Sequence, residues 1–192
     1  DVGALSRMAE GAGLHPGLLR AVIEINADAR RRFVARADAL LDGLDGRRIA
    51  VWGLAFKEGT DDLRESPAIA IIEMLRERGA SVRAHDPAAL ANAERRLAGV
   101  ALCADPLEAA ADVDAVLLCT PWPLYAEIDL RRLATAMRGD LILDGRNFLD
   151  PAAVAAAGLC YEGIGRGQRR SAPPIGDGQI GNAARQPEIA GD

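Results

Sequence analysis

A charged loop after an apolar segment carries the residues best suited to binding an anion. The loop extends from Gly53 to Ser66 and contains Lys57 and Arg64. Ammonium and guanidinium groups both donate charge-assisted hydrogen bonds to phosphate oxygens. Lys57 is the single lysine among 23 basic residues, so it is either a chance exception or a position that needs a compact, mobile ammonium.

A second group of polar residues follows two later apolar segments. One segment leads into Thr120-Pro121-Trp122-Pro123, and the other into Asp144-Gly145-Arg146-Asn147. Ligands of open parallel sheets bind beyond the carboxyl ends of the strands. If both segments are strands of one such sheet, Arg146 and Lys57 lie at the same edge. Two cations that converge there would suit an anionic ligand.

Structural explanations compete with this interpretation. The charged residues of the first loop are Asp61, Asp62, Arg64 and Glu65. They could simply form a local cluster of ion pairs. Arg146 could likewise be a buried structural partner of Asp61 or Asp144, and Trp122 could serve packing alone. No GxGxxG fingerprint follows the first apolar segment, and Gly163-Ile164-Gly165-Arg166 precedes no helix, so neither region predicts dinucleotide binding by itself.

The elements that would position these loops alternate between strands and helices. Strands are expected at Arg48–Phe56, Ser81–His85, Val100–Cys103, Ala115–Thr120, Leu141–Asp144 and Cys160–Gly163. Helices are expected near Pro67–Arg78, Pro87–Leu97, Pro106–Ala111, Leu130–Met137 and Pro151–Ala157. Continuously apolar strands are typical of a parallel sheet that is covered on both faces. A doubly wound, Rossmann-like α/β domain with six parallel strands is therefore predicted over residues 46–167.

Four of the expected helices share one type of beginning. A capping side chain precedes a proline at Ser66-Pro67, Asp86-Pro87, Asp105-Pro106 and Asp150-Pro151. The side-chain oxygen can accept from a free backbone N–H of the first turn, and proline is favoured at the first helical position. These pairs predict where the helices begin.

The ends of the chain differ from this domain. Residues 3–13 show the pattern of a short amphipathic helix, and residues 16–44 show that of a helix roughly 40 Å long. A helix of that length usually joins two domains or packs against a second copy, so residues 1–45 are predicted to be a linker and dimerisation segment. Residues 168–192 lack periodicity, and we expect a disordered tail.

Composition excludes several classes of function. The net charge of -5 argues against a nucleic-acid-binding protein, and no apolar run is long enough to cross a bilayer. Three cysteines without CxxC spacing, together with only two histidines, predict reduced thiols in a cytoplasmic protein and no metal site. The chain begins with Asp1 in a helix-like pattern, from which we expect a part of a longer protein.

The loop residues resemble a known family. Gly53–Lys57 (GLAFK) and Thr60–Pro67 (TDDLRESP) are similar to the signature that opens the C-terminal, UDP-binding domain of the UDP-glucose/GDP-mannose dehydrogenases. Asp144–Asn147 (DGRN) and Gly163–Arg166 (GIGR) resemble two further landmarks of the UDP-glucose branch. The segment Ala21–Asn26 resembles the central helix through which the family dimerises. The resemblance covers about residues 1–167.

The resemblance implies a function and a set of contacts. Enzymes of this family oxidise UDP-glucose to UDP-glucuronate with two NAD, through intermediates bound to a cysteine thiolate. By resemblance, Phe56, Lys57 and Arg146 would contact the nucleotide sugar, and Arg64 would reach the NAD pyrophosphate. The likeness also implies a homodimer that is formed through the long helix.

The same resemblance shows what this chain lacks. The family's NAD-binding domain and the segment with the nucleophilic cysteine have no counterpart here, so no catalytic residue is assigned and the chain alone is expected to be inactive. NAD would be bound mainly by the missing domain. Two alternatives stay open. The parent could be a GDP-mannose or UDP-N-acetylhexosamine dehydrogenase, or the chain could be a non-catalytic nucleotide-binding or dimerisation module.

Overall fold

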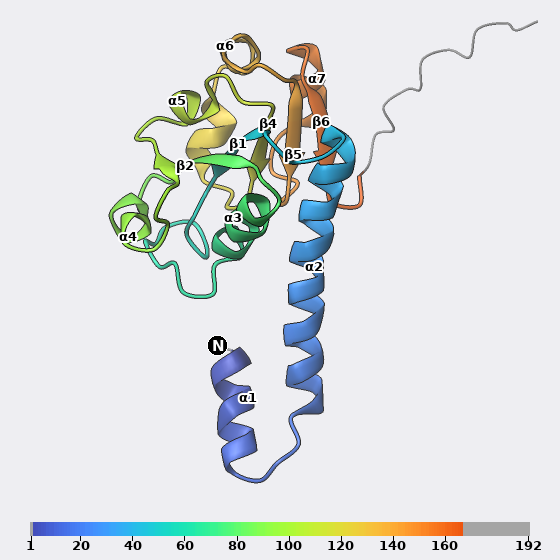
Figure 1. Ribbon diagram of the computed structural model, residues 1–192, viewed down its shortest axis with the longest axis vertical. Coiled ribbons are helices and arrows are strands. Elements are labelled where there is room, and N and C mark those ends of the chain that lie inside the picture. Colours follow the sequence, from blue (N-terminus) through green and yellow to red (C-terminus); the bar gives the residue numbers. More distant parts are fainter. Residues whose placement is uncertain (1, 167–192) are drawn as a thin grey trace, which may run out of the picture.

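The computed structural model describes residues 2–166 (Figure 1). Its strands are β1 (Arg48–Trp52), β2 (Ser81–His85), β3 (Ala101–Leu102), β4 (Ala115–Leu118), β5 (Leu141–Asp144) and β6 (Cys160–Gly163). Its helices are α1 (Val2–Gly11), α2 (Gly17–Leu41), α3 (Pro67–Glu77), α4 (Leu90–Glu94), α5 (Pro106–Ala110), the 3-10 helix η1 (Pro123–Glu127), α6 (Leu130–Ala136) and α7 (Pro151–Ala156). The tail predicted at residues 168–192 lies outside the described residues.

All six strands form one parallel sheet, as the alternating pattern predicted. Their order is β3-β2-β1-β4-β5-β6, so the direction of winding reverses between β1 and β4. In sheets of this order the loops after the two central strands diverge and leave a crevice at the carboxyl edge. The loops that carry Lys57 and Thr120 both begin at that point.

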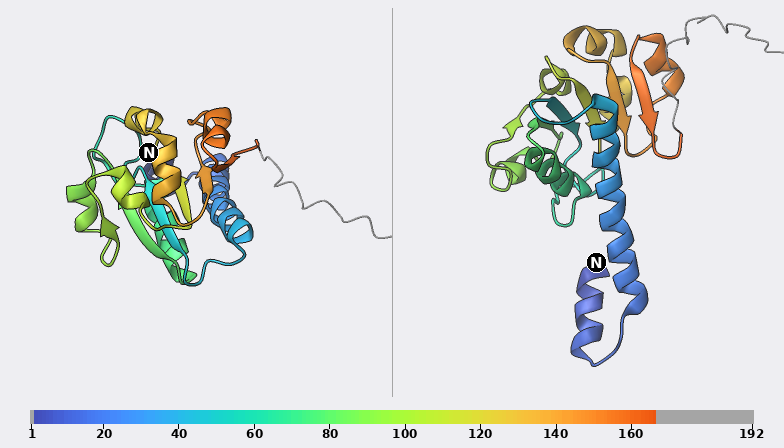
Figure 2. Two further views of the ribbon diagram at one scale, coloured as in Figure 1. Left: turned by 90° about the horizontal axis from the view of Figure 1, so that it is seen from above. Right: turned by 45° about the vertical axis from the view of Figure 1, so that its right-hand side comes forward.

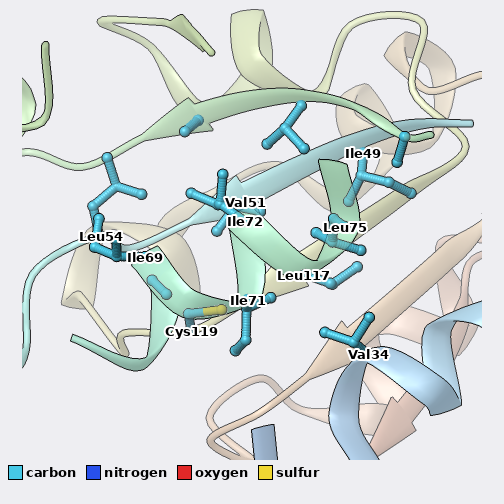
Figure 3. Packing of buried hydrophobic residues seen from close by; sticks show 14 of the residues in the cluster. Val34, Ile49, Val51, Leu54, Ile69, Ile71, Ile72, Leu75, Leu117 and Cys119 are labelled. Carbon is cyan, nitrogen blue, oxygen red and sulfur yellow. The ribbon is translucent and has the colours of Figure 1, made fainter. Parts of the chain in front are cut away.

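The side chains of the sheet divide between two apolar cores. Along β1, Ile49 and Val51 pack with α2, α3 and α4, whereas Ala50 and Trp52 pack with α5, α6 and α7. This alternation follows from the two-residue period of a strand, since neighbouring side chains point to opposite faces. Figure 3 shows the first of these cores, in which Val34 of α2 packs over the sheet beside Ile71 of α3. Both faces are covered, as doubly wound folds require.

Helix α2 belongs to the domain only along its C-terminal half. Phe33, Val34 and Ala37 are buried in the first core. Glu162 of β6 is also buried, and its carboxylate accepts from the guanidinium of Arg36 at 2.8 and 2.7 Å. The N-terminal half of α2 extends away from the sheet, with α1 folded back along it (Figure 2). Helices α1 and α2 therefore form an arm that is anchored at one end.

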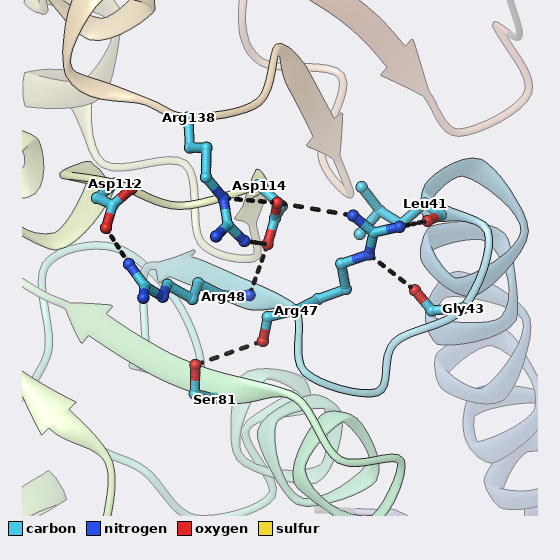
Figure 4. A network of polar contacts seen from close by, with 8 residues as sticks. All are labelled: Leu41, Gly43, Arg47, Arg48, Ser81, Asp112, Asp114 and Arg138. Carbon is cyan, nitrogen blue, oxygen red and sulfur yellow. Dashed lines mark hydrogen bonds and ion pairs between the residues drawn. The ribbon is translucent and has the colours of Figure 1, made fainter.

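The amino edge of the sheet is held by a charged network around Asp114 (Figure 4). The carboxylate of Asp114 accepts from the backbone N–H of Arg48 at 2.8 Å and from the guanidinium of Arg138 at 3.1 and 2.6 Å. Burial alone would raise the pKa of Asp114, but these hydrogen bonds and the nearby charges of Arg138 and Arg47 outweigh burial and lower the pKa below 3.8. Arg47 also donates to the carbonyl oxygen of Leu41 at 2.5 Å, which ties the end of α2 to this edge.

Several expected boundaries were wrong, each for a local reason. Strand β1 ends at Trp52 and not at Phe56, because Gly53 adopts a φ of 85° that interrupts the extended backbone. Helix α4 begins at Leu90 and not at Pro87, because Ala89 leaves helical geometry with a ψ of 3°, although the Asp86 carboxylate accepts from the N–H groups of Ala88 and Ala89 as a helix cap does. Within residues 2–166, no helix is long and apolar enough to cross a membrane.

Candidate functional site

An open cleft lies between α2 and the carboxyl edge of the sheet. Phe56, Lys57, Arg64 and Arg146 all contribute to its wall, so the structure brings together the four residues that the sequence had singled out. The cleft volume is about 2030 Å³, against about 300–1,000 Å³ for a typical small-molecule pocket. A cleft of this size has room for a small-molecule ligand and for part of a second domain that closes over the ligand.

The segment Leu54–Ala55 is fixed by side chains of three other segments. Its two N–H groups donate to the Asp86 carboxylate at 2.7 and 2.9 Å. Its two carbonyl oxygens accept from the hydroxyls of Ser66 and Thr120, each at 2.6 Å. All four backbone polar groups of this buried segment are thus hydrogen-bonded to side chains and not to the backbone of a helix or strand. We call this arrangement the Leu54–Ala55 clamp.

Phe56 and Lys57 follow the clamp directly and point away from the core. The side chain of Phe56 is half-exposed, although the backbone N–H of Phe56 donates to the carbonyl oxygen of Asp62 at 2.8 Å. Lys57 is exposed, and it makes no hydrogen bond or ion pair within the described part of the chain. An apolar ring therefore stands next to an ammonium group that is available to a ligand.

Arg146 reaches the same cleft from the loop after β5. The backbone N–H of Arg146 donates to the carboxylate of Asp144 at 2.8 Å, and its Nε donates to the carbonyl oxygen of Cys119 at 2.7 Å. The alternative in which Arg146 is the buried ionic partner of Asp61 or Asp144 is wrong, because its side chain is exposed and anchored on a neutral carbonyl. Its outer nitrogens can still donate to an anion.

Arg64 is engaged with its own loop. Its guanidinium donates to both carboxylate oxygens of Asp62, at distances from 2.7 to 3.1 Å. The hydrogen bonds from Arg64 lower the pKa of Asp62 to about 2. The expectation of a local ion pair in this loop is thus confirmed for Asp62 and Arg64, whose side chain is nonetheless 86% exposed.

The cysteines do not supply a reactive thiol to the cleft. Cys119 lines the cleft but is buried, and desolvation raises the pKa of its thiol to about 12. A thiol with that pKa is almost fully protonated at neutral pH and is a poor nucleophile. Residues 2–166 contain no group of three or more His, Cys, Asp or Glu side chains that could hold a metal ion.

Sequence reasoning missed the residues that hold the binding loops in place. Asp86 was recognised only as a helix cap, whereas its carboxylate also accepts from the loop after β1 and from the indole Nε1 of Trp122 at 3.1 Å. Asp144 similarly accepts from the N–H groups of Phe148 and Leu149 and from the hydroxyl of Tyr161. The available signal was an aspartate at or directly after the end of a predicted strand.

Comparison with known proteins assigns the family. Residues 50–151 match the UDP-glucose/GDP-mannose dehydrogenase family, UDP binding domain. The chain belongs to this family. The matched residues include the loop with Phe56, Lys57 and Arg64 as well as Arg146, so the side of the cleft that carries these residues belongs to the matched domain, whereas the side formed by α1 and α2 lies outside the match.

Members of the UDP-glucose/GDP-mannose dehydrogenase family match beyond this domain. UDP-glucose 6-dehydrogenase of Pseudomonas aeruginosa is 41% identical over 173 residues, which cover 86% of this chain and 38% of that protein. UDP-glucose 6-dehydrogenase TuaD of Bacillus subtilis is 39% identical over 175 residues, which cover 91% of this chain and 38% of that protein. The chain therefore spans 38% of the length of either relative.

Solved structures show the same architecture. A UDP-glucose dehydrogenase from Pyrobaculum islandicum matches with a TM-score of 0.71 and 35% identity, covering 85% of this chain and 35% of that one. UDP-D-ManNAc dehydrogenase from Pyrococcus horikoshii matches with a TM-score of 0.63 and 28% identity, covering 82% of this chain and 36% of that one. The six-stranded parallel fold of this chain is thus the fold of the corresponding part of these dehydrogenases.

Proposed function

We propose that this chain forms the nucleotide-sugar-binding part of an NAD-dependent UDP-glucose 6-dehydrogenase, which oxidises UDP-glucose to UDP-glucuronate. The observation that carries the proposal is the convergence of Lys57 and Arg146 on one cleft, beside the exposed ring of Phe56. Neither cation is neutralised by an ion pair within residues 2–166. A diphosphate ligand would supply the missing negative charge.

Each of the three residues has a part in binding. Lys57 is a compact point charge at the end of a flexible stem and can follow a diphosphate oxygen. Arg146 is held by its Nε, which leaves the outer nitrogens to donate to the same ligand. Phe56 offers an apolar face to the ring of the base or of the sugar. These residues bind and orient the substrate, and we assign none of them to the oxidation itself.

The loop after β1 does not have the open glycine backbone of a dinucleotide-binding loop. In a dinucleotide-binding loop, glycines let the backbone approach the pyrophosphate. Here a Cβ at Gly53 would lie 2.5 Å from the Cβ of Thr120, so the space beside this glycine is already filled by protein. NAD, which accepts the hydride when bound, would therefore be held mainly by another domain. Arg64, whose side chain is 86% exposed, is the residue that we propose contacts the NAD pyrophosphate.

The arm provides a surface for a second copy of the chain. Exposed apolar side chains on α1, on α2 and between them are Val2, Leu5, Met8, Leu14, Leu18, Ile23 and Ile25. Apolar surface of this extent on one arm is typical of an interface. The dimer proposal predicts that Ile25→Glu yields a monomer by light scattering, whereas Arg78→Ala, at the residue that follows α3, keeps the mass of a dimer. A monomeric wild type would refute it.

The binding proposal is tested by calorimetric titration with UDP, with GDP as the competing nucleotide. We expect this chain to bind UDP more tightly than GDP. Lys57→Ala and Arg146→Ala should each weaken UDP binding about tenfold, the effect of losing one charge-assisted hydrogen bond. Arg78→Ala, an exposed arginine outside the cleft, should bind UDP as the wild type does.

Other outcomes would favour the alternatives. Preference for GDP would indicate a parent that acts on GDP-mannose. Equal binding by all variants would mean that Lys57 and Arg146 do not contact the nucleotide. If the wild type binds neither nucleotide, the proposal of an autonomous nucleotide-sugar site fails, and a role in assembly alone would be favoured.

A further inference from the structure

One buried carboxylate connects several of the loops at the carboxyl edge. Asp86 is fully buried, and it makes no ion pair within residues 2–166. Its Oδ2 accepts from Leu54 and Ala55 of the β1 loop and from Nε1 of Trp122 in the β4 loop. Its Oδ1 accepts from two N–H groups of its own turn. Five donors thus compensate a charge whose burial is otherwise costly.

These contacts control the segment that carries the ligand-binding side chains. Leu54 and Ala55 are held from one side by Asp86 and from the other by the hydroxyls of Ser66 and Thr120. Lys57 is only two residues beyond Ala55 and has no polar contact of its own in the described chain. The clamp is therefore the structure that determines where the Lys57 ammonium can reach.

We propose that Asp86 is a positioning residue for nucleotide-sugar binding, which acts through the Leu54–Ala55 clamp to place Phe56 and Lys57 in the cleft. The inference rests on the proposed function for its ligand, but the ordering of the loop needs no ligand. If the only role of residue 86 were to pack in the hydrophobic core, an apolar side chain would serve as well as a carboxylate. What the carboxylate provides is two acceptor atoms that face N–H donors from separate segments.

Asparagine at this position would disturb the clamp with little change in volume. In Asp86→Asn, one of the two acceptor atoms becomes an NH2 group, whichever way the amide is oriented. At least two N–H groups then face a donor and not an acceptor. A matched control is Asp114→Asn, which changes another buried aspartate at the opposite edge of the sheet. Asp114 contacts neither the clamp nor the cleft residues.

The experiment combines a double-mutant cycle with hydrogen exchange on the whole chain. We expect Asp86→Asn to weaken UDP binding about tenfold in the wild-type background and less than about twofold in the Lys57→Ala background, because residues that act as a unit are not additive. Asp114→Asn should leave UDP affinity unchanged in both backgrounds. Without ligand, exchange of the hydrogen-bonded backbone amides from Leu54 to Phe56 should be about tenfold faster in Asp86→Asn.

The outcomes separate this inference from the proposed function. If Asp86→Asn weakens UDP binding equally in both backgrounds, or leaves loop exchange unchanged, the positioning role is overturned. If the wild type binds no UDP, the proposed function fails, and hydrogen exchange alone then decides whether Asp86 orders the loop. Should Asp86→Asn not fold, Thr120→Val removes only the hydroxyl that donates to Ala55, and it must reproduce the coupling to Lys57 on a smaller scale.

Discussion

Two glycines of one loop provide a sharp test of how the binding loop is built. Gly53 and Gly59 have nearly equal φ angles, 85° and 77°. A Cβ at Gly53 would lie 2.5 to 2.7 Å from the Cβ, N and O atoms of Thr120, whereas a Cβ at Gly59 would meet no atom within 4 Å. Alanine at either position therefore suffers the same backbone strain, but only Gly53→Ala also meets a steric clash.

The magnitudes follow from these two contributions. An alanine in the left-handed region costs about 1–2 kcal/mol. The loss of unfolded-state entropy offsets about 0.4–1 kcal/mol of this cost. Gly59→Ala should therefore lower the free energy of unfolding by about 1 kcal/mol. Overpacking adds about 1–3 kcal/mol. Since two of the three clashing atoms at Gly53 are backbone, relief requires movement of the chain, and we expect Gly53→Ala to cost about 2–4 kcal/mol.

The measurement is urea unfolding at constant pH, with the slope m compared among wild type and both variants. An unchanged m with a lower midpoint would show that stability alone has changed. Gly53→Ala should also weaken UDP binding, because relief of the clash moves the segment before Lys57, whereas Gly59→Ala should affect UDP binding less. If the free energies of unfolding of the two variants differ by less than about 0.5 kcal/mol, the inference that Thr120 packs closely on Gly53 is wrong.

Three further predictions concern other parts of the chain. Arg36→Ala leaves the buried carboxylate of Glu162 without its partner, so it should lower the free energy of unfolding, measured by urea titration, by about 1–3 kcal/mol. As a control, Arg32→Ala removes an exposed ion pair and should lower the free energy of unfolding by less than about 0.5 kcal/mol. Because hydrogen bonds lower the pKa of Asp114 in the folded state, the stabilisation by its carboxylate is fully present above about pH 4 and is lost as the pH falls through the folded-state pKa. Asp114→Asn should therefore show a shallower loss of stability than wild type as the pH is lowered from about pH 4. Since burial raises the pKa of Cys119 to about 12, iodoacetamide at about pH 8 should modify Cys160 in the folded chain well before Cys119, and equal rates as judged by peptide mass would contradict the burial.

The architecture was predictable because strong local signals agreed with one another. Buried strands such as Ala115–Leu118 are apolar throughout, and that pattern requires cover on both faces. The caps at Ser66, Asp105 and Asp150 accept backbone N–H groups as expected. The position of Lys57 and Arg146 on the wall of one cleft was predictable because the carboxyl ends of parallel strands share one edge.

Contacts between distant segments could not be predicted. The end of β1 depends on Gly53, which must make room for Thr120 from the loop after β4. The Asp86 carboxylate accepts both from its own turn and from the loop after β1, a contact between segments that are 31 and 32 residues apart. Likewise, nothing near Arg146 in sequence shows that its Nε donates to the carbonyl oxygen of Cys119. Each of these features is a tertiary contact that overrides a local preference.

The strand order also bears on the sequence of events during folding. Each half of the sheet, β3-β2-β1 and β4-β5-β6, can form by successive crossovers between strands that are neighbours in the chain. Only the pairing of β1 with β4 joins the halves, and it brings together Arg48 and Asp114, which are 66 residues apart. Closure over such a distance is entropically slow. The crevice spans this seam, so the capacity to bind a nucleotide should arise at the last kinetic step, and UDP binding would report completed folding.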